Sequence, residues 1–310
     1  MSAAPAIVPC RYKTGRTLGQ GTYAVVKEAV HIETGKRYAV KVINKKLMEG
    51  KEHMIRNEIA VLRRISIGHA NILTLVDYFE TLNNLYLVTE LAEGGELFDR
   101  ICRKGNYYEH DAAHLVWTIC SAVAYLHEQG IVHREIFQKS GHGKPVDMWA
   151  LGVITYFLLC GYTPFDRQNS MDEMQAILHA EYQFGPIEYW QGVSETAKSF
   201  ITGLLTVDPS LRMTAEQALK HPWLAQAALR QQEAVQQQQQ SQEDMDTETP
   251  HDLLPSMMSR MKARSKLRNA IGAVKAMNSM RKRHEDVVEA PHPEDVSNVE
   301  VLHQGDVDMV

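Results

Sequence analysis

Cysteine is scarce in this chain, and long apolar runs are missing. Four cysteines stand far apart, with no C-x-x-C pair among them: Cys10, Cys102, Cys120 and Cys160. This spacing indicates neither a zinc site nor a disulfide framework, so isolated buried thiols are the simpler interpretation. The nearly all-apolar stretch Val146–Cys160 is shorter than the about 20 residues that a membrane-spanning helix needs. No secretory signal pattern opens the chain, so we expect a cytoplasmic protein, with the nucleus as a second location.

The stretch Val146–Cys160 has apolar residues on every face of a helix drawn through it. Such a helix is expected to be buried on all sides in a large core. Asp147 stands at its start, where the helix dipole favours a carboxylate. The 310 residues, 44% of them hydrophobic, are enough for one large or two medium domains with tails.

The first ninety residues have the pattern of an antiparallel sheet. Arg11–Leu18 leads into the glycine-containing stretch Gly19–Ala29, a turn follows at Thr34-Gly35, and a further strand is expected at Tyr38–Ile43. A dinucleotide-binding glycine loop would open a helix instead, so the context excludes that fold. Glycines at the tip of a hairpin let backbone N–H groups approach phosphate oxygens closely.

Lys41 lies in the apolar strand A-V-K-V-I, where a buried lysine without a partner would be costly. The stretch Met54–Arg64 has helical spacing and carries Glu58, a carboxylate that can pair with Lys41 and hold it over a phosphate. Two more strands are expected at Ile72–Tyr78 and Leu85–Glu90. The whole predicts a small, mostly antiparallel sheet with one helix.

Together with L-Y-L-V-T-E-L-A-E-G-G-E-L-F-D-R-I at Leu85–Ile101, this order resembles the N-lobe and hinge of a eukaryotic protein kinase. The G-G-E-L-F-D-R run resembles the Ca²⁺/calmodulin-dependent serine/threonine kinases in particular. The resemblance implies an α+β, two-lobed protein-kinase-like fold, with a small antiparallel β N-lobe and a mainly α-helical C-lobe. It implies transfer of the ATP γ-phosphoryl group to serine or threonine of protein substrates, with magnesium as the metal cofactor.

The resemblance also implies a nucleotide site. Lys41 would contact the α- and β-phosphates and pair with Glu58. The stretch that would cover the phosphates consists of Leu18, Gly19, Gln20, Gly21, Thr22, Tyr23, Ala24, Val25 and Val26.

The implied adenine site lies in the strands and the hinge. Val26 and Ala39 would form a roof over the purine ring, and Thr89 would be the gatekeeper residue. Glu90 and Ala92 would offer backbone groups to adenine. A carboxylate that would meet the ribose or a substrate arginine belongs to Glu96.

After the amphipathic stretch Asp111–Gln129 comes Ile131–Arg134, which resembles the opening of the kinase catalytic loop. The family continues with an Asp, a Lys two residues later, an Asn five residues later, D-F-G, an activation loop and A-P-E. This chain instead continues E-I-F-Q-K-S-G-H-G-K-P-V-D and contains no D-F-G.

Glu135 has two possible alignments with the family. In the first it replaces the catalytic Asp, with Phe137 in the place of the Lys and Ser140 in the place of the Asn. In the second it is the glutamate of A-P-E, and everything between Arg134 and Glu135 is deleted. The direct run into the helix at Asp147 favours the second alignment. Arg212 in D-P-S-L-R resembles the arginine that pairs with that glutamate; an ordinary surface arginine is the alternative.

The deletion leaves no catalytic residue and no metal ligand to assign. His133 to Lys144 is twelve residues, which can span up to about 40 Å, so the fold can close. The missing segment holds the strands under adenine, so ATP binding is expected to be weak or lost. A positioned general base contributes about 10²–10⁴-fold, and phosphoryl transfer depends on the bound magnesium. We therefore expect the chain to be catalytically impaired or inactive.

The remaining core follows the kinase C-lobe through G-Y-T-P-F-D, D-P-S-L-R and A-L-K-H-P-W-L, with helices near Met171–Ala180 and Ser194–Leu205. Trp223 in H-P-W is expected to pack in the core. The expected order begins with a disordered N-terminus (1–11), an N-lobe (12–91) and a C-lobe with the deletion at 134/135 (92–224). A glutamine-rich acidic linker (225–252), an autoinhibitory and calmodulin-binding segment (253–284) and a disordered acidic tail (285–310) are expected to follow.

The stretch Arg260–Arg283 carries only positive charges, with apolar residues at helical spacing: Leu267, Ile271, Val274, Met277 and Met280. A basic amphipathic helix of this kind fits the acidic, methionine-rich groove of Ca²⁺-loaded calmodulin. A membrane-surface helix, a nuclear-localisation patch and a solvated face are the alternatives. Neither a nucleic acid nor a membrane is expected as a partner. A second hypothesis for the whole chain is a non-catalytic, calmodulin-binding docking module that competes with the full-length kinase.

Overall fold

The computed structural model describes residues 11–21, 24–50, 52–65, 68–104, 107–133, 143–237 and 252–254. Side chains in the long helices are described from Ile59 in the first and up to Leu229 in the last. The expectations for the first ten residues, for 238–251 and for the chain beyond Leu254 lie outside this part. They include all five calmodulin-binding candidates.

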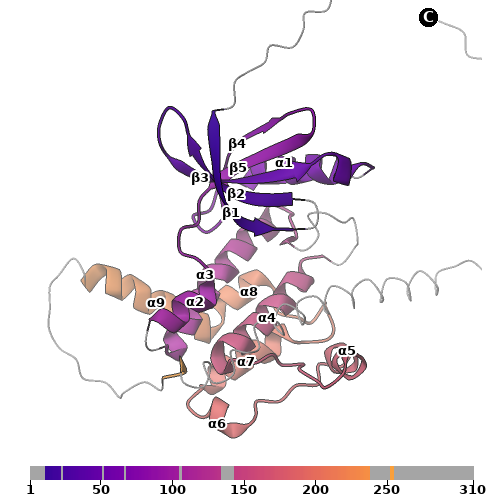
Figure 1. Cartoon of the computed structure of the whole chain (residues 1–310). Helices are drawn as coiled ribbons and strands as arrows, with labels where there is room; N and C mark the ends of the chain where they lie inside the picture. The colour runs from indigo at the N-terminus through magenta and orange to yellow at the C-terminus, as the bar shows by residue number, and fades with distance from the viewer. Residues whose placement is uncertain are drawn as a thin grey trace, which may run out of the picture.

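The chain folds into two lobes, a small sheet lobe above a larger helical lobe (Figure 1). The sheet has five strands: β1 (Tyr12–Gln20), β2 (Ala24–His31), β3 (Arg37–Asn44), β4 (Leu75–Glu80) and β5 (Asn84–Glu90). Their order is β1-β2-β3-β5-β4, and every neighbouring pair is antiparallel. A 3-10 turn (Lys46–Met48) leads to helix α1 (Glu52–Ile65). The predicted α+β, two-lobed kinase-like fold is confirmed.

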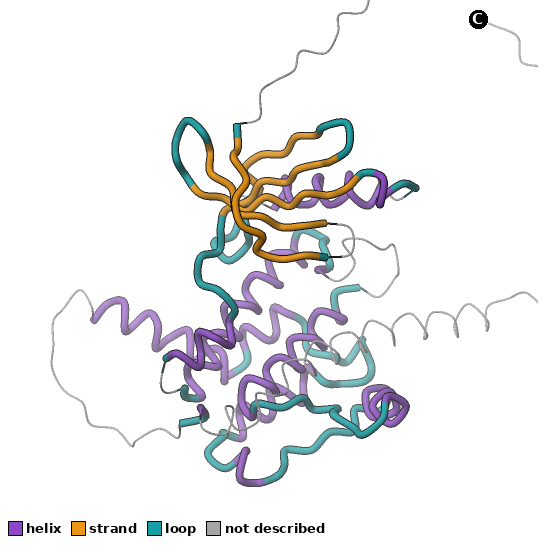
Figure 2. Tube along the Cα trace, viewed as in Figure 1, coloured by secondary structure: helices purple, strands orange, loops and turns teal. Residues whose placement is uncertain are grey.

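Each face of the sheet has its own apolar cluster, because side chains along a strand alternate between the two faces. One cluster contains Ile43, Leu85 and Leu87 and packs against Ile59 and Leu62 of α1. The cluster on the other face contains Tyr12, Ala29, Val40 and Val88. The helix α1 therefore covers one face of the sheet, and Figure 2 shows it beside the strands.

The helical lobe contains α2 (Leu97–Arg103), α3 (Glu109–Glu128), α4 (Pro145–Cys160), α5 (Ser170–Leu178), α6 (Ile187–Trp190), α7 (Glu195–Leu204), α8 (Ala215–Lys220) and α9 (Pro222–Gln237). Helix α4 is buried over nearly its whole length, as its sequence predicts. Helices α3 and α7 pack on it (Figure 1). It ends at Cys160, and the next residue, Gly161, caps it with a φ of 82°, a left-handed conformation that glycine adopts without strain.

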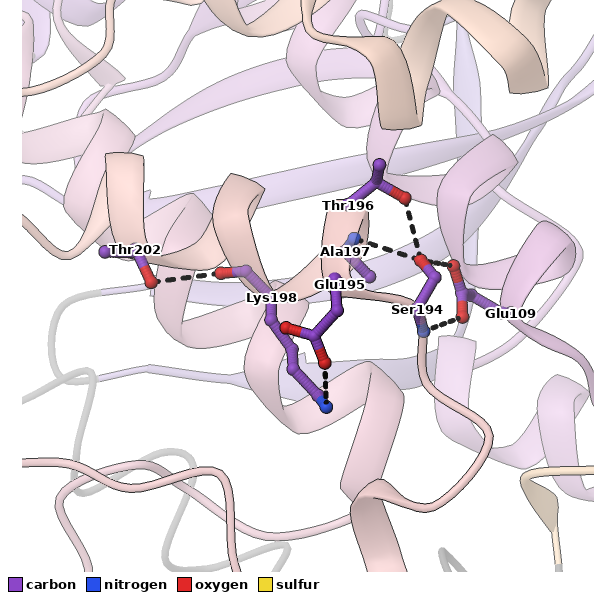
Figure 3. Close-up of polar contacts among 7 residues, drawn as sticks. All are labelled: Glu109, Ser194, Glu195, Thr196, Ala197, Lys198 and Thr202. Atoms are coloured by element: carbon purple, nitrogen blue, oxygen red, sulfur yellow. Dashed lines mark hydrogen bonds and ion pairs between the residues drawn. The ribbon is translucent and has the colours of Figure 1, made fainter.

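A carboxylate ties three of these helices together, and Figure 3 shows its contacts with Ser194. Glu109, at the start of α3, accepts hydrogen bonds from the backbone N–H (2.8 Å) and the hydroxyl (2.6 Å) of Ser194. Its Oε1 also accepts one from the indole N–H of Trp223 at 2.8 Å. The Ser194 hydroxyl in turn accepts from the backbone N–H of Ala197 and caps α7. Trp223 is buried, which confirms its predicted place in the core.

The last helix is longer than expected. The sequence predicts that the C-lobe ends at Leu224 and that a linker begins at residue 225, but α9 runs to Gln237. Pro222 stands at its first position, where proline favours a helix, and alanine, leucine and glutamine are good helix formers. Ala227 is buried against the core. The first part of the expected linker is therefore a helix of the C-lobe.

A small cluster connects the two lobes. Ile65 at the end of α1 packs with Leu126 of α3 and with Ile131, and Tyr125 lies against them. Gly68 lies so close to Tyr125 that an added Cβ would overlap the hydroxyl and ring of this side chain. A larger residue here would therefore require the half-buried Tyr125 side chain to move.

Within the described residues, no helix is both long and apolar enough to span a bilayer.

Candidate nucleotide site and catalytic loop

The glycine hairpin joins β1 and β2 as predicted. Gly19 pairs with Val26 and Gln20 with Val25 across the two strands. The backbone N–H of Gly21 donates to the carbonyl of Ala24 at 2.8 Å and narrows the tip. A Cβ added at Gly19 would meet no atom within 4 Å, so its backbone is open on that side. Thr22 and Tyr23 at the tip lie outside the described residues.

The strand register gathers the other candidates on one face. Val26 of β2 is opposite Lys41 of β3, and Lys41 is opposite Leu87 of β5. Two residues away, Ala39 is opposite Thr89. Paired residues of antiparallel strands point to the same face, and so do residues two apart in one strand. Leu87 belongs to the cluster beside α1, so the side chains of Val26, Ala39, Lys41 and Thr89 are on the face that α1 covers.

Glu58, the expected partner of Lys41, lies in α1, although its side chain is not among those described. The structure therefore brings the lysine strand and the glutamate helix to the same side of the sheet. Lys41 itself is half-buried. The ion pair between Lys41 and Glu58 stays a prediction.

The hinge after β5 is held by a contact that sequence analysis missed. The Glu90 carboxylate accepts a hydrogen bond from the Thr74 backbone N–H at 2.8 Å, and the Glu90 N–H donates to the Thr74 carbonyl at 3.1 Å. Leu18, Ala92 and Glu96 are exposed, and Glu96 occupies the position just before α2. The hinge candidates Ala92 and Glu96, and Leu18 of β1, are therefore open to solvent. No sequence signal pointed to Thr74.

Three charged residues on neighbouring strands of the sheet form two ion pairs that share one carboxylate. The Glu28 carboxylate contacts Arg37 at 2.6 Å and Arg16 at 2.8 Å. The hydrogen bond from Arg37, followed by the one from Arg16, lowers the pKa of the Glu28 carboxyl below its usual value. Arg37 also reaches Glu93 in the hinge at 3.2 Å. These ion pairs join the glycine hairpin strands to the segment that leads into the C-lobe.

The start of the catalytic loop is fixed on the central helix. The Asp147 carboxylate accepts a hydrogen bond from the His133 backbone N–H at 2.9 Å and lies 2.9 Å from Nε2 of His127. The side chains of His127 and Asp147 are 8% and 3% exposed. The His-Arg turn is therefore held against the aspartate of the central helix. The role of His127 was missed, because it is one polar residue within an amphipathic helix and carries no local signal.

Arg212 is not an ordinary surface arginine. Its guanidinium donates to the carbonyls of Thr206 (2.8 Å), Pro145 (2.8 Å) and Val207 (3.0 Å). It also lies over the Trp149 ring, 4.7 Å from the ring centre, at a distance typical of a cation–π contact. Glu135, its expected partner, lies outside the described residues. The arginine therefore links the loop after α7 to the start of α4.

The residues that the structure describes do not form the magnesium site that kinases use. Mg²⁺ requires several oxygen ligands in near-octahedral geometry. In kinases these ligands include the D-F-G aspartate and the catalytic-loop asparagine, and the sequence has no D-F-G. In the part of the chain that the structure describes, no group of three or more His, Cys, Asp or Glu side chains is placed to hold a metal ion. We therefore assign no metal ligand.

Comparison with known proteins agrees with this architecture. The family described as protein kinase domain matches the chain over residues 12–136 and 135–224. The calcium/calmodulin-dependent protein kinase cmkB of Emericella nidulans is 50% identical, over 96% of this chain and 84% of that protein. The calcium/calmodulin-dependent protein kinase type I of Schizosaccharomyces pombe is 46% identical, over 89% of this chain and 91% of that protein.

A more distant relative covers less of the chain. The serine/threonine-protein kinase DCLK1 of Rattus norvegicus is 38% identical, over 71% of this chain and 61% of that protein. The family match extends over both lobes, and the two fungal relatives are similar over nearly the whole chain. The chain therefore belongs to the protein kinase family, in the group of the calcium/calmodulin-dependent serine/threonine kinases.

Proposed function

We propose that this chain is a calcium/calmodulin-dependent kinase relative that has lost phosphoryl transfer and keeps a calmodulin-binding segment. The observation that carries the proposal is the sequence after His133-Arg134, which passes within ten residues into α4 and contains neither the catalytic Asp nor D-F-G. Both ends of this passage are held: His133 by Asp147, and Pro145 by Arg212. Both ends of the short junction are therefore attached to the C-lobe, although the catalytic segment is missing between them.

The lengths of the alignments support an internal deletion. The alignment with the Emericella relative spans 352 positions, whereas 96% of this chain is about 298 residues. The alignment with the Schizosaccharomyces relative spans 325 positions, against about 276 residues for 89% of this chain. In each case about 50 positions have no counterpart here. The two parts of the family match overlap at Glu135-Ile136, which supports a deletion at this junction under either alignment of Glu135.

The missing groups are those on which the chemistry depends. The catalytic-loop Asp accepts the proton of the substrate hydroxyl, and the metal ions neutralise the charge that develops on the phosphoryl group. The chain retains Lys41 and the glycine hairpin, which bind phosphates by charge and by backbone N–H groups. Binding of this kind positions a nucleotide but supplies neither a base nor a metal. Turnover is expected far below the roughly 1–100 s⁻¹ of protein kinases.

A phosphorylation assay on the purified chain tests this loss. With radiolabelled ATP, Mg²⁺ and a serine/threonine peptide, we expect no transfer above that of the Lys41→Met variant, with or without Ca²⁺ and calmodulin. The Schizosaccharomyces pombe relative is the positive control. Metal-dependent phosphorylation that disappears in Lys41→Met would contradict the proposal and restore the alternative of a working kinase with an improvised base. Sequencing the transcript across the codons of Arg134 and Glu135 establishes whether the messenger lacks the segment.

The calmodulin part of the proposal has its own test. The basic stretch Arg260–Arg283 contains three bulky apolar residues, Leu267, Val274 and Met280. Counted from Leu267 as position 1, they stand at positions 1, 8 and 14, a spacing that suits an amphipathic helix bound in a hydrophobic groove. We expect a Ca²⁺-dependent gel shift of the peptide 260–283 and of the whole chain, abolished by Leu267→Ala with Val274→Ala. Asn269→Ala, on a polar position of the same stretch, is the matched control. No shift at micromolar calmodulin would contradict binding.

This second activity does not depend on the first. A chain that binds calmodulin without transferring phosphate competes with the full-length kinase for Ca²⁺-loaded calmodulin. The relatives named as calcium/calmodulin-dependent kinases support calmodulin as the partner. Competition is measured by adding this chain to a calmodulin-activated kinase and restoring the activity with excess calmodulin.

A further inference from the structure

Three residues far beyond the last helix lie in the core of the C-lobe. Asp252, Leu253 and Leu254 are described although the residues on both sides of them are not. Leu253 is 1% exposed and Leu254 is 4% exposed, and both belong to the main apolar cluster of the helical lobe. Figure 1 draws them as a short separate orange segment beside this lobe. A linker residue would be exposed, so this burial requires a specific docking site.

The docking site is made by the chain just before α3. The Leu253 backbone N–H donates to the Tyr107 carbonyl at 2.6 Å, and the Tyr107 N–H donates to Oδ1 of Asp252 at 2.8 Å. Tyr108 and Asp252 form an isolated antiparallel bridge. The tripeptide therefore adds to this segment as a strand would, and one main-chain hydrogen bond together with one bond to the Asp252 carboxylate fixes its register.

Asp252 also orders the tripeptide itself. Its Oδ1 accepts a second hydrogen bond, from the Leu254 backbone N–H at 2.9 Å, which is the arrangement of an Asx turn. One carboxylate oxygen thus binds the Tyr107 backbone and also holds the turn that directs the two leucines into the core. Asparagine retains this acceptor atom, whereas alanine lacks it.

We propose that Asp252–Leu254 is an anchor that docks on the Tyr107 backbone and in the C-lobe core and fixes the point from which the C-terminal segment leaves the kinase fold. The site takes an extended Asp-Leu-Leu peptide, and its occupant is this chain's own tail. The anchor is separate from the candidate nucleotide site, which lies on the sheet and the hinge. It makes the beginning of the C-terminal segment part of the folded lobe.

The anchor limits where the basic stretch can reach. From Leu254, Arg260 is six residues away and at most about 20 Å; from Gln237, the end of α9, it is 23 residues away and at most about 80 Å. Because effective concentration falls roughly as the −3/2 power of tether length, the anchor raises the local concentration of the basic stretch at the C-lobe about sevenfold. Only this consequence rests on the proposed calmodulin function.

Hydrogen exchange of the full-length chain tests the anchor without calmodulin or nucleotide. In the unmodified chain we expect the amides of Tyr107, Leu253 and Leu254 to exchange at least tenfold more slowly than those of an unstructured peptide. Asp252→Ala, and Leu253→Ala with Leu254→Ala, are expected to remove this protection. Asp252→Asn is expected to keep most of it, because the Oδ1 acceptor remains.

Two controls separate loss of the anchor from loss of the fold. Leu229→Ala changes a 58% exposed leucine of α9 and is expected to leave exchange at Leu253 unchanged. The amides of Ile201 and Leu204 in buried α7 are expected to stay protected in every anchor variant. Unprotected Leu253 and Leu254 amides in the unmodified chain, or equal protection in Asp252→Ala, would overturn the proposal. A failed calmodulin shift with a protected anchor would reject the proposed function alone.

Discussion

At the scale of the residue, a buried or half-buried polar group takes its behaviour from the atoms that contact it. His221 receives the Trp223 backbone N–H on Nδ1 at 3.3 Å, and its Nε2 lies 3.4 Å from the Ser199 hydroxyl. Phe200 packs against the ring with centres 5.3 Å apart. A ring that accepts on Nδ1 is in its neutral form, and burial lowers the pKa of His221 below its ordinary value.

The lowered pKa of His221 predicts a pH dependence of stability. The unfolded chain binds the proton more readily, with a histidine pKa of about 6.5, so the contribution of His221 is complete above that pH. It is lost as the pH falls from there through the lowered pKa of the folded state. We expect His221→Asn, which offers an acceptor in place of Nδ1, to flatten this part of the curve. Unfolding in urea from pH 7.5 to 5 measures it, and parallel curves for both chains would contradict it.

The Glu109 carboxylate, at the junction of three helices, is expected to contribute strongly to the stability of the C-lobe. Glu109→Ala removes three hydrogen bonds and leaves the Trp223 indole N–H without its partner. Bonds to a charged group contribute about 1.5–3 kcal/mol each at most, and they are not additive. We expect a loss of about 3 kcal/mol, measured by urea unfolding.

The neighbouring Glu195 is the matched control for this substitution. It is 86% exposed and pairs only with Lys198 among the contacts in Figure 3, at 2.7 Å. An exposed helix ion pair contributes about 0.3–0.5 kcal/mol. Glu195→Ala is therefore expected to change stability by less than 1 kcal/mol, and an equal effect of the two substitutions would show that burial plays no part.

At the scale of the element, the C-lobe depends on how closely α7 approaches α4. Gly152 lies in the middle of α4, where an added Cβ would be 2.9 Å from Leu204 Cβ and 2.9 Å from Leu205 Cδ2. Both leucines are buried, and a packed interior yields little to added volume. The glycine therefore serves the contact between the helices, although it lowers the intrinsic helix propensity of α4.

Gly152→Ala is expected to destabilise the chain by about 1–3 kcal/mol through overpacking. Gly203→Ala in α7 is the control. Its Cβ would overlap Cε of Met213, which is the end of a flexible side chain that can move away. Thermal unfolding of both variants compares them, and a Gly152→Ala chain as stable as Gly203→Ala would contradict the packing argument.

Buried thiols give a second result at this scale. Cys120 of α3 and Cys160 of α4 are buried, and Cys102 of α2 is half-buried. Burial raises the pKa of the Cys120 thiol to about 12, so it stays protonated and unreactive near neutral pH. The interpretation of isolated buried thiols is confirmed for Cys120 and Cys160.

At the scale of the whole molecule, the two lobes retain the kinase arrangement while the segment between His133 and α4 is short. Helix α4 supplies Asp147 to one side of the junction and Trp149 to the stacking of Arg212 on the other. These contacts lie within the C-lobe, and the packing of its helices does not depend on a bound nucleotide. The described fold is therefore held together by contacts that do not require the missing segment.

The same arrangement predicts how the chain responds to nucleotide. If no carboxylate ligates the metal, Mg²⁺ adds nothing to ATP binding, and stabilisation follows the affinity for ATP alone. At 1 mM ATP we expect Tm to rise by less than about 2 °C, whether or not Mg²⁺ is present. A larger shift that requires Mg²⁺ would reveal a metal ligand in this chain, and Lys41→Met is the control for binding through the phosphates.

The amino-acid sequence by itself determined the family, the lobes and the missing catalytic groups. These are carried by local patterns: the G-Q-G hairpin, A-V-K, and the absence of D-F-G. It also determined that α4 is buried, because apolar residues on every face of a helix leave no side for water. The strand periodicity placed the sheet, with bounds that shifted by a few residues.

Only the tertiary structure decided which distant residues meet. Tyr107 and Asp252 are 145 positions apart, and Glu109 and Trp223 are 114 apart. Helical or strand periodicity reports which side of an element is buried, but not what covers it. For that reason the contacts of His127, Thr74 and the anchor at Leu253 had no signal in the sequence. The chain beyond Leu224 was interpreted as a linker for the same reason, although α9 continues to Gln237 and Ala227 packs in the core.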